Sequence, residues 1–261
     1  MPTEPWDEFS ERLRDLETAE FAPDIISPFL ALPGLRAFYP MSAVGTAGEA
    51  RDMGSSGATY DLTNNNVAIF NYDGLVPYCG YDGVNQYHSF IDNANFDILG
   101  TEVYIAAAAN GLTIGGWFYY DTLVAAAQLI GKMDIVGPSL SYRLAIDGTP
   151  RTYLQISNNG AAFTHGVNGL DAYTTTLAWH FVVGRFIPST ELKLWVDDNI
   201  VTTAVAPAAI WNSTADFTIG AADAAGNPFD GRASLCFLCT TALSDGIIDS
   251  LFQQTRGAFG I

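Results

Sequence analysis

The chain has 261 residues, of which 49% are hydrophobic and 13% aromatic. This composition describes a globular protein with a sizeable core, and it excludes a disordered chain, a collagen-like chain and a disulfide-built miniprotein. The 28 acidic residues outnumber the 11 basic ones and give a net charge of -17, which argues against nucleic acids and anionic membranes as partners because both require clustered Lys and Arg.

The first 20 residues predict an amphipathic helix. Its large apolar side chains recur at spacings of three or four residues, which places them on one stripe. They are Trp6, Phe9, Leu13 and Leu16. Such a helix is marginal alone in water, so the stripe packs either on its own domain or, in our partner-docking hypothesis, on a neighbouring subunit. The segment lacks the basic and hydrophobic regions of a secretory signal, so we expect no signal peptide.

Prolines punctuate the segment that follows. They stand at Pro23, Pro28, Pro33 and Pro40. This recurrence predicts an extended, semi-rigid arm rather than a regular helix or a central strand. We therefore divide the chain into a docking helix with its proline-rich arm, residues 1–33, and a folded domain, residues 34–261.

Beyond Leu35 short apolar runs alternate with clusters of Gly, Asn, Asp and Pro, which predicts a chain of β-strands. The predicted strands span 36–40, 67–72, 87–91, 112–120, 142–146, 153–157, 179–186, 192–197, 217–220 and 233–240. Strict alternation in the run 192–197 places Leu192, Leu194 and Val196 on one face. Many short antiparallel strands indicate a β-sandwich. Ser244 caps a short helix near the C-terminus.

Three cysteines are present. Cys236 and Cys239 form a CxxC pattern, but within a strand a separation of three residues directs the two thiols to opposite faces. We therefore predict no zinc site and no disulfide from them, and we interpret both, with Cys79, as core thiols.

Seven segments in sequence order resemble the laminin-G-like, concanavalin A-like jelly-roll superfamily. They are GLRAFYPMS, DMGSSGATYDLTNN, YDGVNQYHSFID, LTIGGWFYYD, AWHFVVGRF, ELKLWVDDNIV and DFTIGAADAAGNPFDGRASLCFLCTTALSDGIIDSLF. The resemblance covers about residues 34–256. The expected fold class is all-β: an antiparallel two-sheet jelly-roll sandwich with an N-terminal helix and extended arm and a short C-terminal helix.

Relatives in this superfamily often hold calcium, so the resemblance raises a calcium hypothesis. Asp82, Asp92 and Asp97 are the candidate ligands, since calcium prefers oxygen donors. They lack a regular loop spacing, and we favour the alternative that these residues form turns with local hydrogen bonds. No other cofactor is expected.

Some members of the superfamily are glucanases, which need two carboxylates across a sugar cleft. Glu49, Glu102 and Glu191 stand isolated, and the chain contains no ExDxE-like cluster. The three histidines have no neighbouring nucleophile or carboxylate that the sequence reveals. We expect no enzymatic activity.

The resemblance also implies carbohydrate binding, in which aromatic faces stack on sugar rings. Trp117, Trp179 and Trp195 fall on strands and are predicted to lie in the core. Trp211 lies in a loop-like run, where functional residues concentrate. The candidate glycan-contacting residues are Trp211, Asn212, Asn158, Asn159, His165, Asn168 and Tyr173. Turns and subunit contacts are an alternative role for the same residues.

A further resemblance, to proteins encoded in phage and prophage structural gene regions, rests on LPGLRAFYPMS, GLVPYCGYDGVNQY, GLTIGGWFYYD, AWHFVVGRFIPSTELKLWVD and NSTADFTIG with DGRASLCFLC. This similarity implies a non-catalytic virion surface component, either a capsid decoration protein or part of a tail or fibre, with residues 1–33 docking on other virion subunits. A lectin-like module that recognises host or environmental glycans is the alternative. Homo-oligomerisation stays open in both.

Overall fold

The computed structural model describes residues 22–44, 48–54, 57–74, 76–100, 109–135, 139–147, 151–169, 175–203 and 205–261. The predicted N-terminal helix with its stripe of Trp6, Phe9, Leu13 and Leu16 lies outside these residues.

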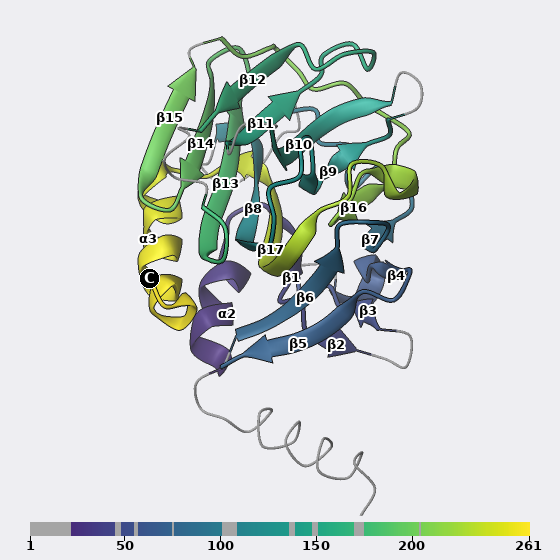
Figure 1. Cartoon of the computed structure of the whole chain (residues 1–261). Helices are drawn as coiled ribbons and strands as arrows, with labels where there is room; N and C mark the ends of the chain where they lie inside the picture. Colours follow the sequence, from purple (N-terminus) through teal and green to yellow (C-terminus); the bar gives the residue numbers. More distant parts are fainter. Residues whose placement is uncertain are drawn as a thin grey trace, which may run out of the picture.

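Two antiparallel sheets form a sandwich, which confirms the expected fold class (Figure 1). Sheet A contains, in spatial order, β15 (Asn199–Thr203), β14 (Glu191–Val196), β13 (Trp179–Ile187), β8 (Ala109–Tyr120), β17 (Asp230–Ala242), β6 (Val76–Asp82) and β5 (Ile69–Asp73). The long β17 also pairs with β1 (Leu35–Tyr39).

Sheet B contains β12 (His165–Asn168), β11 (Thr152–Ile156), β10 (Leu140–Ile146), β9 (Gln128–Met133), β16 (Phe217–Ile219), β7 (Tyr87–Phe90) and β4 (Thr63–Asn65). A small ribbon joins β2 (Ala43–Val44) to β3 (Glu49–Ala50). Three short 3-10 helices, η1 (Gly57–Tyr60), η3 (Asp223–Ala225) and η4 (Arg256–Phe259), complete the described elements.

The main core lies between the two sheets and follows from the period of two along each strand. In β14, Leu192, Leu194 and Val196 point into this core, as their alternation predicts, and Trp195 points to the opposite face of sheet A. Cys236 and Cys239 also face opposite sides of sheet A, which confirms the predicted orientation of the two thiols. All three cysteines are free and buried.

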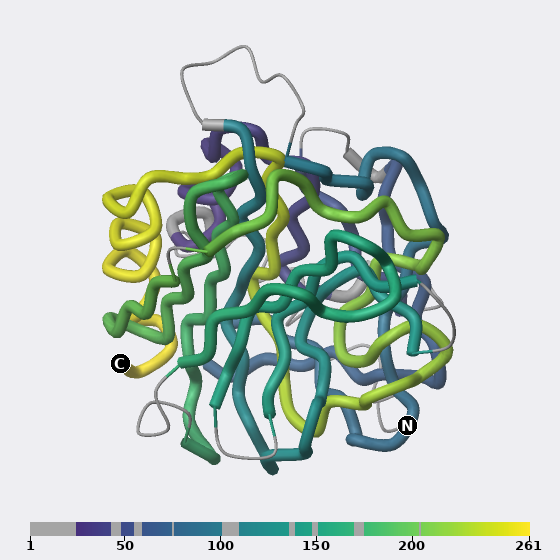
Figure 2. The backbone as a smooth tube through the Cα atoms, turned by 90° about the horizontal axis from the view of Figure 1, so that it is seen from above, coloured from purple at the N-terminus to yellow at the C-terminus, as the bar shows by residue number. Residues whose placement is uncertain are grey.

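A second apolar layer covers the outer face of sheet A. It is formed by α2 (Ala22–Leu30), α3 (Asp245–Thr255) and η4, and Figures 1 and 2 show α3 alongside the edge of β13 and β14. Trp117, Trp179 and Trp195 are buried in this layer, as the sequence predicts. The indole of Trp117 stacks on Phe259 at 4.0 Å and donates a hydrogen bond to Thr255 Oγ1 at 3.0 Å.

The predicted extended arm is wrong for residues 22–30, which form helix α2 with Pro28 inside it. A proline in a helix interior costs about 3 kcal/mol. Phe29 is fully buried and stacks on Phe38 at 4.9 Å, and Ile25 is also buried. Each such side chain contributes roughly 1.5–3 kcal/mol on burial, so the two together offset the proline. The α2 segment therefore packs on the sandwich rather than extending away from it.

No helix among the described residues is long and apolar enough to span a membrane.

Candidate functional site

Trp211 has an unusual position among the tryptophans, because 44% of its side chain is exposed while three others are core residues. Its indole lies directly on the backbone of Gly160, where a Cβ atom would overlap the ring. Two backbone contacts fix the tryptophan, since its N–H donates to Ser157 O at 2.8 Å and its carbonyl accepts from Ser141 Oγ at 2.8 Å. The aromatic ring is thus held in place while part of it faces solvent.

The loop of residues 157–164, which follows β11, supplies the surroundings of Trp211. Asn159 Oδ1 accepts hydrogen bonds from the amides of Ala161 and Ala162, and Asn158 Oδ1 accepts one from Thr164 Oγ1. These are the local turn contacts of Asx residues. His165 joins the same chain of contacts through Nδ1, which lies 2.9 Å from Thr164 Oγ1.

The structure therefore brings together five of the seven predicted residues, which we call the Trp211 surface. They are Trp211, Asn212, Asn158, Asn159 and His165. Asn168 is exposed but lies at the other end of β12, paired with Tyr153, roughly 10 Å further along the strand. Tyr173 lies outside the described residues.

The two segments that form the Trp211 surface, residues 157–165 and 210–214, contain no Asp or Glu. Hydrolysis of a glycosidic bond requires a pair of carboxyl groups, one acting as an acid and one as a base or nucleophile. The Trp211 surface instead offers an aromatic ring, amides and an imidazole, which suit binding of a hydroxyl-rich ligand.

Two of the candidate calcium ligands, Asp92 and Asp97, form ion pairs with the same lysine. Lys132 is fully buried, and its ammonium lies 2.6 Å from Asp92 and 3.1 Å from Asp97. Asp82 is placed elsewhere, where its Oδ1 accepts hydrogen bonds from three backbone amides of the following turn, which hold the pKa of its carboxyl low against the opposing effect of burial. The described residues contain no group of three or more His, Cys, Asp or Glu that could hold a metal.

Sequence reasoning missed a histidine–carboxylate pair in sheet A. His180 Nδ1 lies 2.8 Å from Asp197 Oδ2, although 16 residues of strand and turn separate them. The other ring nitrogen lies 3.0 Å from the carbonyl of Thr175 and 3.2 Å from its hydroxyl. The backbone N–H of Thr175 lies 3.3 Å from this same nitrogen, so both ring nitrogens are engaged and the pair ties the loop at Thr175 to sheet A.

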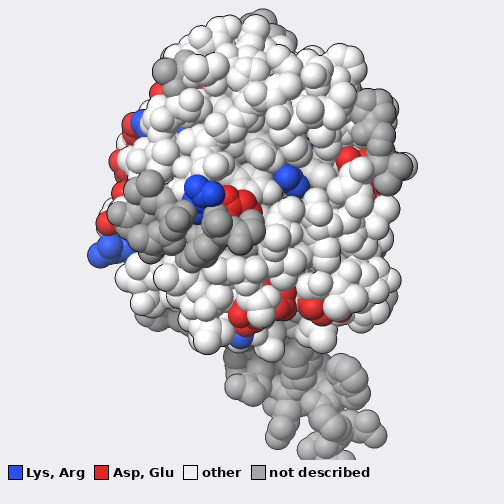
Figure 3. Space-filling model, turned by 45° about the horizontal axis from the view of Figure 1, so that its top comes forward, with Lys and Arg blue, Asp and Glu red and all other residues white. Residues whose placement is uncertain are grey.

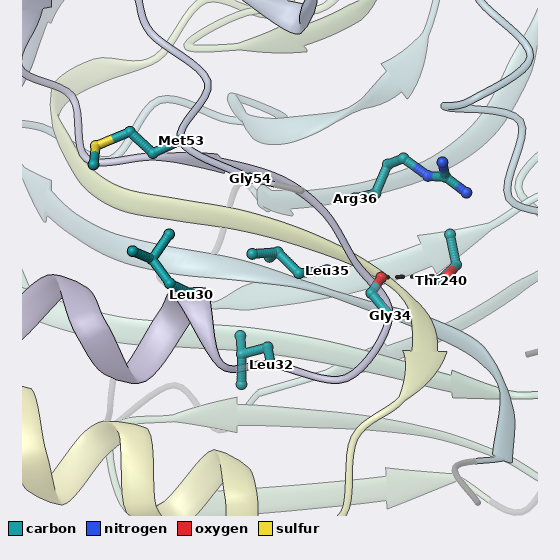
Figure 4. A pocket seen from close by; sticks show the side chains of 8 residues that line it. All are labelled: Leu30, Leu32, Gly34, Leu35, Arg36, Met53, Gly54 and Thr240. Carbon is teal, nitrogen blue, oxygen red and sulfur yellow. Dashed lines mark hydrogen bonds between the residues drawn. The ribbon is translucent and has the colours of Figure 1, made fainter. Parts of the chain in front are cut away.

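A pocket of about 500 Å³ beside α2 is a separate surface (Figure 4). Polar and apolar atoms contribute about equally to its lining, which includes the half-exposed Leu30 and Met53, and Arg36 is the charged side chain among the described residues that line it. The face shown in Figure 3 carries charged side chains only in small groups, separated by wide uncharged areas. A broad charged patch that would attract a polyanion or polycation is not a feature of that face.

A sequence profile of the concanavalin A-like lectin/glucanases superfamily matches residues 92–246. A search of curated proteins finds no match.

Several solved structures share the fold. The binding domain of Paraclostridial Mosquitocidal Protein 1 superposes with a TM-score of 0.62 at 10% identity, over 84% of this chain and 52% of that one. The botulinum neurotoxin serotype D binding domain gives 0.63 at 9% identity, over 85% and 52%. A Trypanosoma rangeli sialidase in complex with 2,3-difluorosialic acid gives 0.61 at 16% identity, over 88% and 34%. The chain spans about a third to a half of these structures, and at these identities the likeness shows the fold alone.

Proposed function

The chain belongs to the concanavalin A-like lectin/glucanase superfamily, and from that membership we propose that it is a non-catalytic binding module that contacts glycans through the Trp211 surface. The observation that carries this proposal is the exposed indole held on Gly160 beside the loop of Asn158 and Asn159. An immobilised aromatic ring stacks on a sugar at little entropic cost, because it is already ordered before binding.

The structural relatives support a binding role in general terms. Two of them are described as binding domains, and a further one, the binding domain of botulinum neurotoxin DC, is described in complex with rat synaptotagmin II. That last structure gives a TM-score of 0.56 at 13% identity, over 84% of this chain and 51% of that one. A protein ligand is therefore an outcome that the experiment must distinguish from a glycan.

A glycan array with three proteins tests the proposal. The native chain is expected to bind at least one glycan class, and Trp211→Ala to bind it about tenfold or more weakly, since a buried aromatic contact of about 1.4 kcal/mol changes affinity tenfold. Ile200→Ala is the matched control, because Ile200 on β15 has the same exposed fraction of 44%. Failure of the native chain to bind any glycan, or equal binding by Trp211→Ala, would overturn the proposal.

We propose a virion surface as the setting in which this module acts, with the N-terminal segment docking on other virion subunits. The support is the similarity of the sequence segments to phage structural proteins and the apolar stripe of Trp6, Phe9, Leu13 and Leu16. Because α2 packs on sheet A, the informative deletion removes residues 1–21 and leaves α2 intact. Reduced incorporation into particles with unchanged thermal stability is the expected result, and full incorporation would overturn the docking role.

A further inference from the structure

A groove of about 330 Å³ lies on the outer face of sheet A, in the part that α2 and α3 leave uncovered. Strand register explains its shape. Ile69 on β5 pairs with Gly80 on β6, Gly80 pairs with Arg232 on β17, and Arg232 pairs with Tyr119 on β8. These four residues form one rank across the sheet. The side chains of Ile69, Arg232 and Tyr119 share its outer face, and Gly80 leaves a gap between them. The volume of the groove falls within the range of binding sites for small ligands.

Arg232 is fixed in the groove by aromatic rings. Its guanidinium carbon lies 4.3 Å from the ring centre of Tyr119 and 5.1 Å from that of Tyr78. The nearest carboxylates, on Asp121 and Asp73, lie 3.8 and 3.9 Å away, beyond hydrogen-bond distance. The guanidinium is therefore oriented by cation–π contacts, while its N–H groups keep their capacity to donate to a ligand.

Gly80 forms the open floor of the groove. A glycine within a strand weakens the sheet and is found where a ligand or another backbone approaches closely. The neighbouring strands do not require a glycine at this position. A Cβ atom on Gly80 would lie 3.7 Å from its nearest atom, Ile69 O, which is an ordinary van der Waals contact. The missing side chain thus leaves space in the groove without serving the packing of the sheet.

The charges around the groove select the kind of ligand. Asp121 and Asp82 line the groove, and Asp73 lies beside it, 3.9 Å from the guanidinium. Oδ1 of Asp82 is occupied by three backbone amides, but all three carboxylates repel an anion that approaches Arg232. Arg232 in turn repels a cation that approaches these carboxylates. A neutral molecule with hydroxyl groups satisfies both, because a hydroxyl donates to a carboxylate and accepts from a guanidinium or an amide. Asn71 adds an amide to the lining, and the exposed Ile69 adds an apolar edge.

We propose that this groove binds a neutral saccharide unit, with Arg232, Asp121 and Asn71 as its polar contacts and Gly80 as the surface on which the ring lies. The site lies on sheet A and does not rest on the Trp211 surface, whose loops follow β11 and precede β16 of sheet B.

Saturation-transfer NMR with the full chain and a panel of neutral methyl glycosides tests the proposal. Gly80→Val fills the groove in a strand where valine is well tolerated, and it is expected to abolish saturation transfer. Asn71→Ala, at an exposed position of the edge strand, is expected to weaken binding about tenfold, which keeps the test valid if the valine disturbs the sheet. Thermal unfolding of both variants checks the fold.

Trp211→Ala separates this groove from the Trp211 surface. Glycoside binding that survives Trp211→Ala but not Gly80→Val supports the groove. Binding lost only in Trp211→Ala supports the Trp211 surface and overturns the groove. Absence of binding by the native chain at millimolar glycoside, or preferential binding of methylguanidine or of a sialic acid at the groove, also overturns the proposal.

Discussion

The ammonium of Lys132 lies 2.6 Å from Oδ1 of Asp92, although the lysine side chain has no exposed surface. The same ammonium contacts Asp97 at 3.1 Å and donates to the carbonyls of Ser213 and Ala215 at 2.6 and 2.7 Å. A buried ammonium is tolerated only when such oxygens replace its hydration. Lys132 on β9 therefore ties the loop after β7 to the segment before β16.

Replacing this lysine is expected to destabilise the protein strongly. Lys132→Met leaves Asp92 and Asp97 without their counter-charge, and removal of one partner from a buried pair costs about 3–5 kcal/mol of unfolding free energy. Urea denaturation measures the loss. Lys193→Met is the comparison, because Lys193 pairs with Asp245, which is 46% exposed, and a more exposed pair is worth about 1 kcal/mol or less. Equal losses in the two variants would contradict the argument.

Calcium is expected to stabilise only a variant that lacks Lys132. Lys132→Ala exposes two carboxylates and two carbonyl oxygens that surrounded the ammonium, and these are ligand types that calcium prefers. We expect millimolar calcium to raise the melting temperature of Lys132→Ala and to leave that of the native protein unchanged. Differential scanning fluorimetry with calcium, magnesium and EDTA checks both statements, and a calcium response of the native protein would show that a metal site lies elsewhere.

Gly160 is expected to tolerate no side chain. Its φ of +75° lies in the left-handed region, and a Cβ would overlap the indole of Trp211. Gly160→Val should therefore lower the unfolding free energy by about 1–3 kcal/mol and also weaken any ligand binding at the Trp211 surface. Gly246→Ala is the control, since a Cβ there meets no atom within 4 Å and replaces glycine in a helix. An unchanged free energy of unfolding in Gly160→Val would contradict this argument, because it would mean that the indole moves freely away from the added side chain.

His88 is expected to make stability depend on pH in the acid range. Burial lowers its pKa from 6.5 to about 4, against the opposing effect of its hydrogen bond to the Gly48 carbonyl. Between these two pH values the unfolded chain binds a proton that the folded chain does not, so stability falls as the pH drops from 6.5 towards 4. The loss attributable to His88 reaches about 3 kcal/mol. Urea denaturation of native protein and His88→Gln from pH 7 to 4 measures it, and parallel curves would contradict the prediction.

The thiols are expected to be inert in the folded protein. Burial raises the pKa of Cys79, Cys236 and Cys239 well above the ordinary value of 9.0, and only the thiolate reacts. A thiol reagent at pH 8 should label none of them within minutes in native buffer and all three in denaturant. Rapid labelling of one cysteine in native buffer would reveal local opening of sheet A around it.

Short apolar runs predicted much of the sandwich. All ten predicted strands are present within a few residues, because clusters of Gly, Asn, Asp and Pro bound them whether one face or both faces are buried. The sequence analysis did not predict seven strands, which are β2, β3, β4, β6, β9, β12 and β15. Strand β6 contains Pro77 and Gly80, and the run HGVN of β12 has little apolar alternation. In these two, pairing with a neighbouring strand outweighs weak local preference. Helix α2 was missed because its prolines dominate the local pattern and the burial of Phe29 depends on distant residues.

The candidate site was predictable only in its exposed parts. Trp211 stood out because it lies outside any strand pattern, and its loop partners followed from their Asn content. The contact with Gly160 links residues 51 positions apart, and the Arg232 groove depends on the register of four strands. A single sequence does not specify such pairings, so neither contact was foreseen.

The pairing of β1 with β17 bears on how the chain acquires its structure. Thr241 Oγ1 donates to the carbonyl of Pro33 at 2.7 Å, across 208 residues. During synthesis, β1 leaves the ribosome long before β17 is made. The apolar face of β1 is therefore uncovered until the last fifth of the chain has been synthesised. Contacts of such sequence separation slow folding, so we expect that ribosome-bound chains truncated before β17 remain sensitive to protease and that closure of sheet A is a late step.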